Sequence, residues 1–167
     1  PILSTPFDAK DNIIFNDVDS EVEYAINSGV SGVAIALASE VYKLTDSERD
    51  EFLKRVVDCA KNRIKVCMNT TAESTKICIE YSKKAQDLGA DAVMIAPPSF
   101  GGVDTNEIKK YFINVAESIE IPIFMQDVFE TPISPELALD LSQANKNLAY
   151  LKVEVPPTLP RFNKLKK

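Results

Sequence analysis

Short apolar runs and amphipathic helical patterns alternate along the whole chain, and this alternation restricts the fold more than any other feature. Each run is nearly continuous in apolar residues, as expected for strands of a parallel sheet whose two faces are both covered. The runs begin about 30 residues apart, which is the length of one βα unit. We therefore predict six parallel strands, at residues 2–4, 32–36, 64–68, 92–96, 122–126 and 148–154.

Apolar residues at helical spacing predict helices between these strands. Thr45-Asp46-Ser47-Glu48 has the pattern of a capping box and begins the second helix. Ser134 and Pro135 are residue types favoured at the N-cap and in the first turn of a helix. The predicted helices cover residues 17–28, 46–60, 74–88 and 105–118, a segment from 134 onward, and an incomplete helix after 158.

This pattern fits an open doubly wound sheet and a (β/α)8 barrel, and the pattern alone does not decide between them. A barrel needs eight strands and about 250 residues. The chain has 167 residues, so a barrel would lack roughly two βα units at its C-terminal end. A doubly wound domain fits the length better. A flavodoxin-like binding domain, however, needs a phosphate-binding loop, and the spacing of Gly101 and Gly102 matches neither GxxxxGK[ST] nor GxGxxG.

Charge and hydropathy exclude several classes of partner. The formal net charge is −6, which argues against nucleic acid or an anionic membrane as the main partner. The apolar runs have the length of strands, so we expect no segment that spans a membrane. The first residues lack the basic flank and the apolar core of a signal peptide. We therefore expect a cytoplasmic protein.

The chain contains no histidine, and this absence removes Ser-His and Cys-His nucleophilic schemes together with most zinc sites. Cys59, Cys67 and Cys78 form no CxxC pair. We expect them to be reduced thiols in the core. Acid–base chemistry must therefore use Lys, Tyr, Asp, Glu, backbone groups or groups of the substrate.

Lys152 stands near the end of the last apolar run, Leu148 to Glu154, which we interpret as a buried strand. An amine at such a position is poorly solvated, and desolvation disfavours its charged form. A neutral lysine can attack a carbonyl carbon and form a Schiff base. The alternative is a structural lysine that leaves the core and places its ammonium group in water.

Several short motifs follow one another in a characteristic order. They are Thr5-Pro6-Phe7, Gly29 to Val33, Glu40 with Leu44-Thr45 and Glu48-Arg49, Gly89 to Val93 before Pro97-Pro98, and Leu151 to Glu154. As an ordered set, they resemble the dihydrodipicolinate synthase and N-acetylneuraminate lyase family of Schiff-base aldolases. The resemblance covers essentially the whole chain, and it places Lys152 where the family keeps its Schiff-base lysine.

The resemblance implies a (β/α)8 barrel of which about the first six βα units are present, so that residues 1–167 form a single incomplete barrel domain. It implies a lyase, either an aldolase or a dehydratase, that acts on pyruvate or another 2-oxo acid through Lys152. It implies no metal and no organic cofactor. It also implies a homo-oligomer, a dimer or a tetramer, with neither nucleic acid nor membrane as partner.

The chain departs from the family pattern at several positions. The family usually has a Gly-Thr-Thr-Gly-Glu loop after the second strand, where this chain has Ala36 to Glu40. The family's tyrosine at the end of strand five is replaced by Gln126, and its tyrosine pair after strand four by Ser99-Phe100. An amide cannot act as an acid or base at neutral pH. The alternative is therefore an impaired or regulatory barrel that binds a small carboxylic acid without turnover.

Active sites of barrels lie where strands end and in the following loops. That rule selects residues after each strand: Ser4, Thr5, Ser39, Glu40, Asn69, Thr70, Ser99, Phe100, Gln126, Asp127, Lys152 and Glu154. We assign catalytic roles to Lys152, Gln126 and Tyr150. We assign substrate binding to Thr5, Leu37, Ala38, Ser39, Glu40, Phe100 and Glu154.

Each assignment has a structural alternative. Residues two apart share one face of a strand, so Tyr150, Lys152 and Glu154 should point the same way. Tyr150 either relays protons or is a core phenol, and Glu154 either sets the protonation of the amine or forms a salt bridge at the rim. Gln126 either binds substrate oxygens or is a structural amide. For Asp127 we expect an N-capping or loop role.

Overall fold

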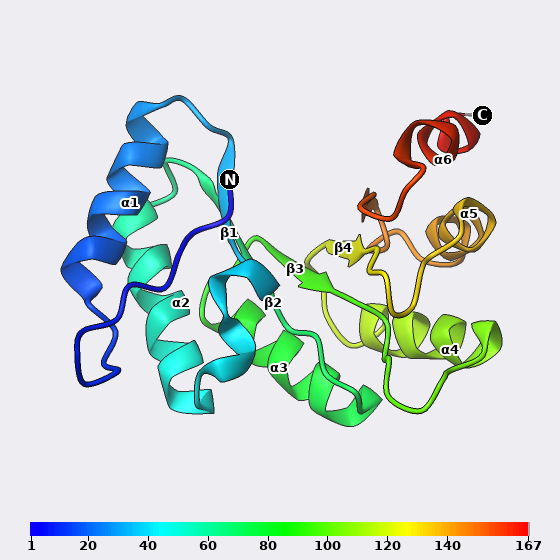
Figure 1. Ribbon diagram of the computed structural model, residues 1–167, viewed down its shortest axis with the longest axis horizontal. Coiled ribbons are helices and arrows are strands. Elements are labelled where there is room, and N and C mark those ends of the chain that lie inside the picture. Colours follow the sequence, from blue (N-terminus) through cyan, green and yellow to red (C-terminus); the bar gives the residue numbers. More distant parts are fainter. Residues whose placement is uncertain (167) are drawn as a thin grey trace. The chain divides into compact units, whose positions relative to one another are not determined.

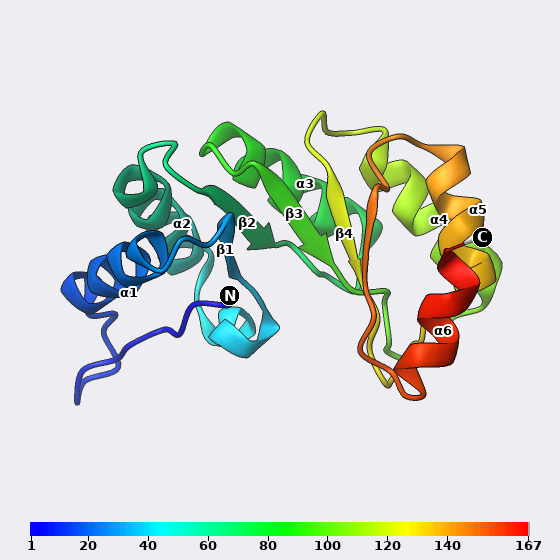
Figure 2. The same ribbon diagram turned by 90° about the horizontal axis from the view of Figure 1, so that it is seen from above.

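The computed structural model of the protein describes residues 1–166 (Figures 1 and 2). The chain divides into two compact units, and each unit alternates strands with helices. The first unit contains residues 1–69 and 84–92, and the second contains residues 70–83 and those from 93 onward. Helix α3 (Thr75–Asp87) contributes residues to both units.

The first unit is built on two parallel strands, β1 (Gly32–Ile35) and β2 (Lys65–Asn69). Gly32 lies opposite Lys65 in their register. A Cβ atom at Gly32 would lie 2.7 Å from the backbone oxygen of Lys65, so the close approach of the strands requires glycine here. Ile2 adds one parallel bridge to Ala34, with hydrogen bonds from Leu3 N to Ala34 O and from Ala34 N to Pro1 O.

Two α-helices, α1 (Phe15–Asn27) and α2 (Asp46–Ala60), lie side by side in the first unit (Figures 1 and 2). Their buried residues recur at helical spacing, with Val18 and Val22 in α1, and Phe52 and Val56 in α2. This spacing places the apolar side chains on one stripe of each helix. Two short 3₁₀ helices, η1 (Leu37–Ser39) and η2 (Val41–Lys43), connect β1 to α2.

The second unit contains three parallel strands, β3 (Ala92–Ile95, with Ala92 counted in the first unit), β4 (Ile123–Gln126) and β5 (Tyr150–Lys152). β4 pairs with both of the others, and Figure 2 shows it beside β3. Because the strands are parallel, their carboxyl ends lie at one edge of this sheet. The loops that follow the strands therefore start from the same edge.

Helices α4 (Thr105–Ala116), α5 (Pro135–Ala144) and α6 (Thr158–Leu165) complete the second unit. α5 lies between α4 and α6 (Figures 1 and 2). Asp104 caps α4 and Ser134 caps α5, each through a side-chain oxygen that accepts backbone N–H groups of the first turn. The largest apolar side chains buried in this unit are Phe112, Ile95, Ile123, Met125, Ile133, Leu141 and Leu148.

Most predicted elements are confirmed to within a few residues, and two predicted strands need correction. The first predicted strand is reduced to the bridge at Ile2, so residues 1–166 contain five strands of more than one residue. The run from Leu148 to Glu154, predicted to be a buried strand, forms the shorter β5, in which Tyr150 is exposed and Leu151 and Lys152 are half-buried. Among residues 1–166, β5 is hydrogen-bonded to a strand along only one of its edges, the edge next to β4. Its residues are therefore less buried than predicted.

The described part of the chain, residues 1–166, has no helix with both the length and the apolar character that crossing a bilayer requires. Cys67 and Cys78 are buried and Cys59 is half-buried, and all three are free thiols. Burial raises the pKa of the Cys67 thiol to about 12. Cys67 is therefore a protonated core side chain at neutral pH.

The capping box of α2 gives a direct test of this local structure. Thr45 Oγ1 accepts from the backbone N–H of Glu48, and the Glu48 carboxylate accepts from the backbone N–H of Thr45 at 2.8 Å. We predict that Thr45→Ala lowers the free energy of unfolding by about 1 kcal/mol, because it removes the hydroxyl that accepts from Glu48 N and donates to the Glu48 carboxylate. Urea denaturation followed by circular dichroism measures the loss. Thr45→Ser keeps the hydroxyl and is the control. Equal midpoints for the two variants would contradict the prediction.

Candidate functional site

The carboxyl ends of β4 and β5 bring together several of the residues that the sequence selects. Gln126 is the last residue of β4 and Lys152 the last of β5, and they are register partners in the parallel pair. Paired residues of adjacent strands point to the same face of a sheet. The predicted nucleophile and the predicted amide therefore lie next to each other.

Glu154 joins these two side chains. Its Oε1 lies 2.9 Å from Lys152 Nζ in an ion pair, and its Oε2 accepts a hydrogen bond of 3.0 Å from Gln126 Nε2. The carboxylate thus has one oxygen fixed by the amide and the other directed at the amine. The side chains of Lys152 and Glu154 are 28% and 39% exposed, so a small molecule can approach the amine.

Tyr150 lies on the same strand two residues before Lys152, but it is not the core phenol that the sequence allowed. Its side chain is 48% exposed, and its ring stacks on Phe124 with centroids 4.5 Å apart. Phe124 and Tyr150 are register partners two residues before Gln126 and Lys152, on the same face of the strands. The stacked rings therefore form an apolar surface next to the polar cluster, which consists of Gln126, Lys152 and Glu154.

Asp127 follows Gln126 and has the predicted loop role. It is fully buried, and its carboxylate accepts from the backbone N–H groups of Ile133 and Val155. It does not cap α5, because Ser134 does. Arg161 of α6 forms an ion pair with Asp127 at 2.7 Å. Sequence reasoning missed Arg161, since only the fold brings a residue 34 positions away to Asp127.

The loop after β3 is held by Glu73, which sequence reasoning also missed. Its carboxylate accepts from the backbone N–H groups of Ser99 and Phe100 and from the Ser99 hydroxyl. Burial opposes ionisation of this group, but the three hydrogen bonds outweigh burial and lower the pKa of Glu73. Phe100, a predicted substrate-binding residue, is 89% exposed at the tip of this loop.

The remaining predicted site residues belong to the first unit, except Thr70, and most of their polar groups are already engaged. The Thr5 hydroxyl donates to Ser39 O, and the buried Ser39 hydroxyl donates to Leu3 O while accepting from Ala36 N. Glu40 forms an ion pair with Lys43. Leu37 and Ala38 open the 3₁₀ helix η1, where the first N–H groups have no partner within the helix.

Asn69 and Thr70, selected as strand-end residues, are buried and have structural contacts. Asn69 O accepts a hydrogen bond of 3.0 Å from Arg49 Nη2 within the first unit. The Thr70 hydroxyl lies 2.8 Å from that of Ser82 within the second unit. Both residues are about 1% exposed. A substrate therefore has little access to either side chain.

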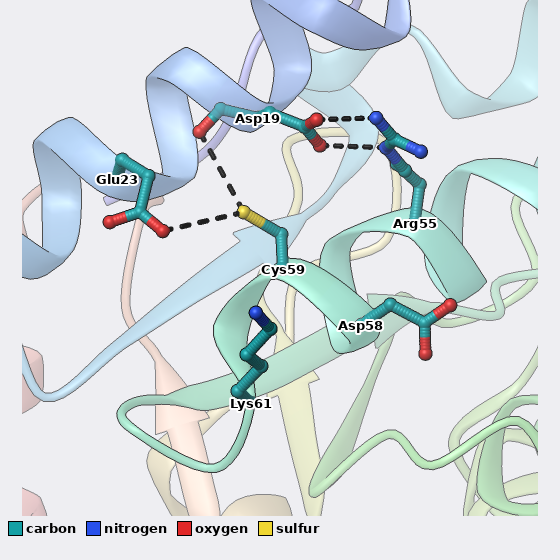
Figure 3. A pocket seen from close by; sticks show the side chains of 6 residues that line it. All are labelled: Asp19, Glu23, Arg55, Asp58, Cys59 and Lys61. Atoms are coloured by element: carbon teal, nitrogen blue, oxygen red, sulfur yellow. Dashed lines mark hydrogen bonds and ion pairs between the residues drawn. The ribbon is translucent and has the colours of Figure 1, made fainter.

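An open pocket of about 280 Å³ lies between α1 and α2 (Figure 3). Its charges compensate one another, because Asp19 pairs with Arg55 and Glu23 pairs with Arg63. Burial, followed by the charges of Asp19 and Glu23, raises the pKa of the Cys59 thiol on its wall. A thiol of this kind is a poor nucleophile. Across residues 1–166, no group of three or more Cys, Asp and Glu side chains is placed to hold a metal ion.

Comparison with known proteins gives one consistent result. The sequence profile of the dihydrodipicolinate synthetase family matches residues 1–156. L-2-keto-3-deoxyarabonate dehydratase of Azospirillum brasilense is 29% identical over 99% of this chain and 55% of its own length. A dihydrodipicolinate synthase crystal structure superposes with a TM-score of 0.93 at 29% identity, covering 99% of this chain and 58% of that one.

A third relative shows the fold alone. It is a prophage protein of Escherichia coli K12, a member of the same family crystallised with pyruvate, with a TM-score of 0.92 and 23% identity over 99% of this chain and 56% of that one. The chain thus spans a little over half the length of these relatives. The predicted (β/α)8 class, with only part of the barrel present, is confirmed, and the doubly wound alternative is wrong.

The Glu73 contacts predict a pH dependence of the loop after β3. The ordinary pKa of this carboxyl is 4.5, and that of Glu73 is lower. Its hold on Ser99 and Phe100 is therefore complete at pH values above 4.5 and is lost as the pH falls through the lowered value. We expect the backbone amide NMR signals of Ser99 and Phe100 to titrate with a midpoint below 4.5. Glu73→Gln should abolish this titration. A midpoint at or above the ordinary value would contradict the prediction.

Proposed function

The chain belongs to the dihydrodipicolinate synthetase family, and on that premise we propose that it is a lyase that forms a Schiff base between Lys152 and a 2-oxo acid. The observation that carries this proposal is the contact between the Lys152 amine and the Glu154 carboxylate at the end of a parallel strand. Strand ends of this kind are where barrel enzymes keep their reactive groups. Pyruvate, bound by one relative of the same fold, is the first substrate to test.

In the proposed reaction, Glu154 handles the protons. Oε1 first takes a proton from the Lys152 ammonium group, and the neutral amine then attacks C2 of the 2-oxo acid. A proton moves from nitrogen to the former carbonyl oxygen, giving a carbinolamine. Glu154 returns its proton to that hydroxyl, water leaves, and a protonated imine remains. The balance is one ammonium and one carbonyl converted to one iminium and one water, with Glu154 again a carboxylate.

Gln126 has a positioning role in this scheme. Its amide holds Oε2 of Glu154 and leaves Oε1 for the amine. Gln126 cannot transfer protons itself, so the carboxylate takes over the task for which the family uses a tyrosine. Tyr150 and Phe124 would support the apolar part of a bound substrate, since their stacked rings lie on the same face two residues before Lys152 and Gln126.

After the imine has formed, the iminium group withdraws electrons from C3 of the substrate, and this permits aldol cleavage or addition as well as loss of a hydroxyl at C4. A dehydratase is supported by the similarity to L-2-keto-3-deoxyarabonate dehydratase. An aldolase-type synthase is supported by the similarity to dihydrodipicolinate synthase. The family resemblance also assigns substrate binding to Leu37, Ala38 and Glu40 of the first unit, and this assignment stays a prediction. The resemblance likewise supports a cytoplasmic homo-oligomer.

The second candidate function is binding of a small carboxylic acid without turnover. The observation that favours it is the engagement of the Thr5 and Ser39 hydroxyls inside the first unit, together with Gln126 in place of the family's tyrosine. This candidate predicts thermal stabilisation by pyruvate without any covalent product. The trapping experiment below separates the two candidates.

Reduction with borohydride tests the Schiff base. We predict that incubation with pyruvate and borohydride adds the mass of one reduced pyruvyl group to the chain, and that peptide mapping locates it on Lys152. Lys152→Met removes the nucleophile and should abolish the product, while Lys164→Met, which alters an exposed lysine of α6, should not. If no pyruvate or longer 2-oxo acid adds mass at Lys152, the proposed function is wrong.

The role of Glu154 predicts a separate effect on the rate of imine formation. Glu154→Gln should slow trapping at neutral pH by about a hundredfold or more, because general acid–base catalysis is lost while the shape of the side chain is kept. The rate is measured by quenching with borohydride at increasing times. Glu136→Gln removes the partner of Lys164 and is the matched control. A rate within the error of the unmodified protein would exclude Glu154 as the proton carrier.

A further inference from the structure

The buried ion pair between Asp127 and Arg161 lies beside every member of the polar cluster at the strand ends. Asp127 directly follows Gln126, and its backbone N–H donates to Lys152 O at 3.1 Å. Its carboxylate Oδ2 accepts from the backbone N–H of Val155, the residue after Glu154, at 3.0 Å. The pair therefore contacts the chain on the immediate flanks of the cluster.

The same pair also forms hydrogen bonds to the segments that follow β4 and β5. Asp127 Oδ1 accepts from Ile133 N at 2.9 Å, at the far end of the loop after β4. Arg161 Nη2 donates to Asp127 Oδ2 and to Ile133 O, each at 2.7 Å. One carboxylate and one guanidinium group thus join the end of β4, the loop after it, the exit of β5 and helix α6.

A contribution to the stability of the fold does not by itself explain why this ion pair is buried here. Asp127 is fully buried and the Arg161 side chain is 16% exposed, so both ions have lost most of their hydration. Arg161 Nε is buried without a hydrogen-bond partner among residues 1–166, and so is the nearby loop's Thr131 Oγ1. A buried ion pair with an unsatisfied N–H contributes little net stability. Charge-assisted hydrogen bonds, however, fix the direction of the groups that they join.

We propose that Asp127 and Arg161 are positioning residues that hold the exit of β5 in the path that places Glu154 against Lys152. Neither residue is assigned a contact with substrate. Their effect passes through Val155 N, which fixes the backbone next to Glu154, and through Lys152 O, which fixes the backbone of the lysine. The importance of this geometry for catalysis rests on the proposed function, but the coupling between the pair and the Lys152–Glu154 contact does not.

The coupling can be measured without any substrate. Acetic anhydride acetylates neutral and accessible amines, so the rate at Lys152, read by peptide mass spectrometry, reports whether the contact between Lys152 and Glu154 is formed. The exposed Lys76 of α3 serves as the internal reference. At fixed pH, Glu154→Gln should raise the relative rate at Lys152 by roughly two- to fivefold, the factor expected from losing a partly exposed ion pair.

The decisive experiment is a double-mutant cycle between Glu154→Gln and Arg161→Met. If the pair positions Glu154, the effect of Glu154→Gln on Lys152 labelling should shrink to a factor near one in the Arg161→Met background. Asp140→Asn breaks the ion pair between α4 and α5 at Lys109 and is the control, in which the full effect should persist. An undiminished effect in folded Arg161→Met protein would overturn the proposal.

Circular dichroism establishes that each variant is folded. If Arg161→Met does not fold, Asp127→Asn takes its place in the cycle, because it keeps the shape of the side chain while removing its charge, and the same two outcomes decide. Failure of pyruvate trapping in the unmodified protein would refute the proposed function and leave the labelling cycle intact. Successful trapping with an undiminished Glu154→Gln effect would refute the positioning role alone.

Discussion

The parallel pairing of β4 with β5 is the constraint on which the candidate site depends. The register sets Gln126 opposite Lys152 and Phe124 opposite Tyr150. Because side chains alternate between the two faces of a strand, this single register places a polar pair above a stacked aromatic pair on one face. A shift of one residue in either strand would place Lys152 and Gln126 on opposite faces. The amide of Gln126 therefore meets the amine and the carboxylate because of the observed register.

The contact between Lys152 and Glu154 changes the chemical argument that the sequence supports. From the sequence, the reactivity of Lys152 rests on desolvation of an amine in a buried strand. In the structure, the lysine is half-buried and has a carboxylate 2.9 Å from Nζ. A neighbouring carboxylate supplies a route for the proton instead of removing the charge by burial. The proposed nucleophile and the proposed proton carrier are thus adjacent, in the same strand and its exit.

The departures from the family pattern also gain a physical meaning. By the family resemblance, Gln126 stands where the family has a tyrosine, and its amide binds Glu154, so in the proposed reaction this position supports a proton carrier without being one. In the first unit, Ser39 takes a structural role, since its hydroxyl joins Leu3 to Ala36. In the proposed reaction, proton handling is therefore concentrated at the exit of β5, close to Lys152.

Local signals predicted most elements well because their causes are local. The hydroxyl of Thr45 and the carboxylate of Glu48 lie three residues apart and cap α2 as expected. Ser134 likewise caps α5. The predicted first strand was less accurate, because a single bridge to Ala34 is set by a distant partner. The burial of β5 was overestimated for a similar reason, because an apolar run in the sequence does not indicate whether the strand is paired along one edge or along both.

The sequence by itself determined the alternation of strands and helices, the family, and the position of Lys152 at the end of a strand, because these follow from local composition and spacing. Only the tertiary structure decided which groups surround that lysine. Asp127 and Arg161 are 34 residues apart in the chain, and Glu73 reaches Ser99 across 26 residues. Such partners depend on the path of loops between elements, and no spacing rule along the sequence encodes that path.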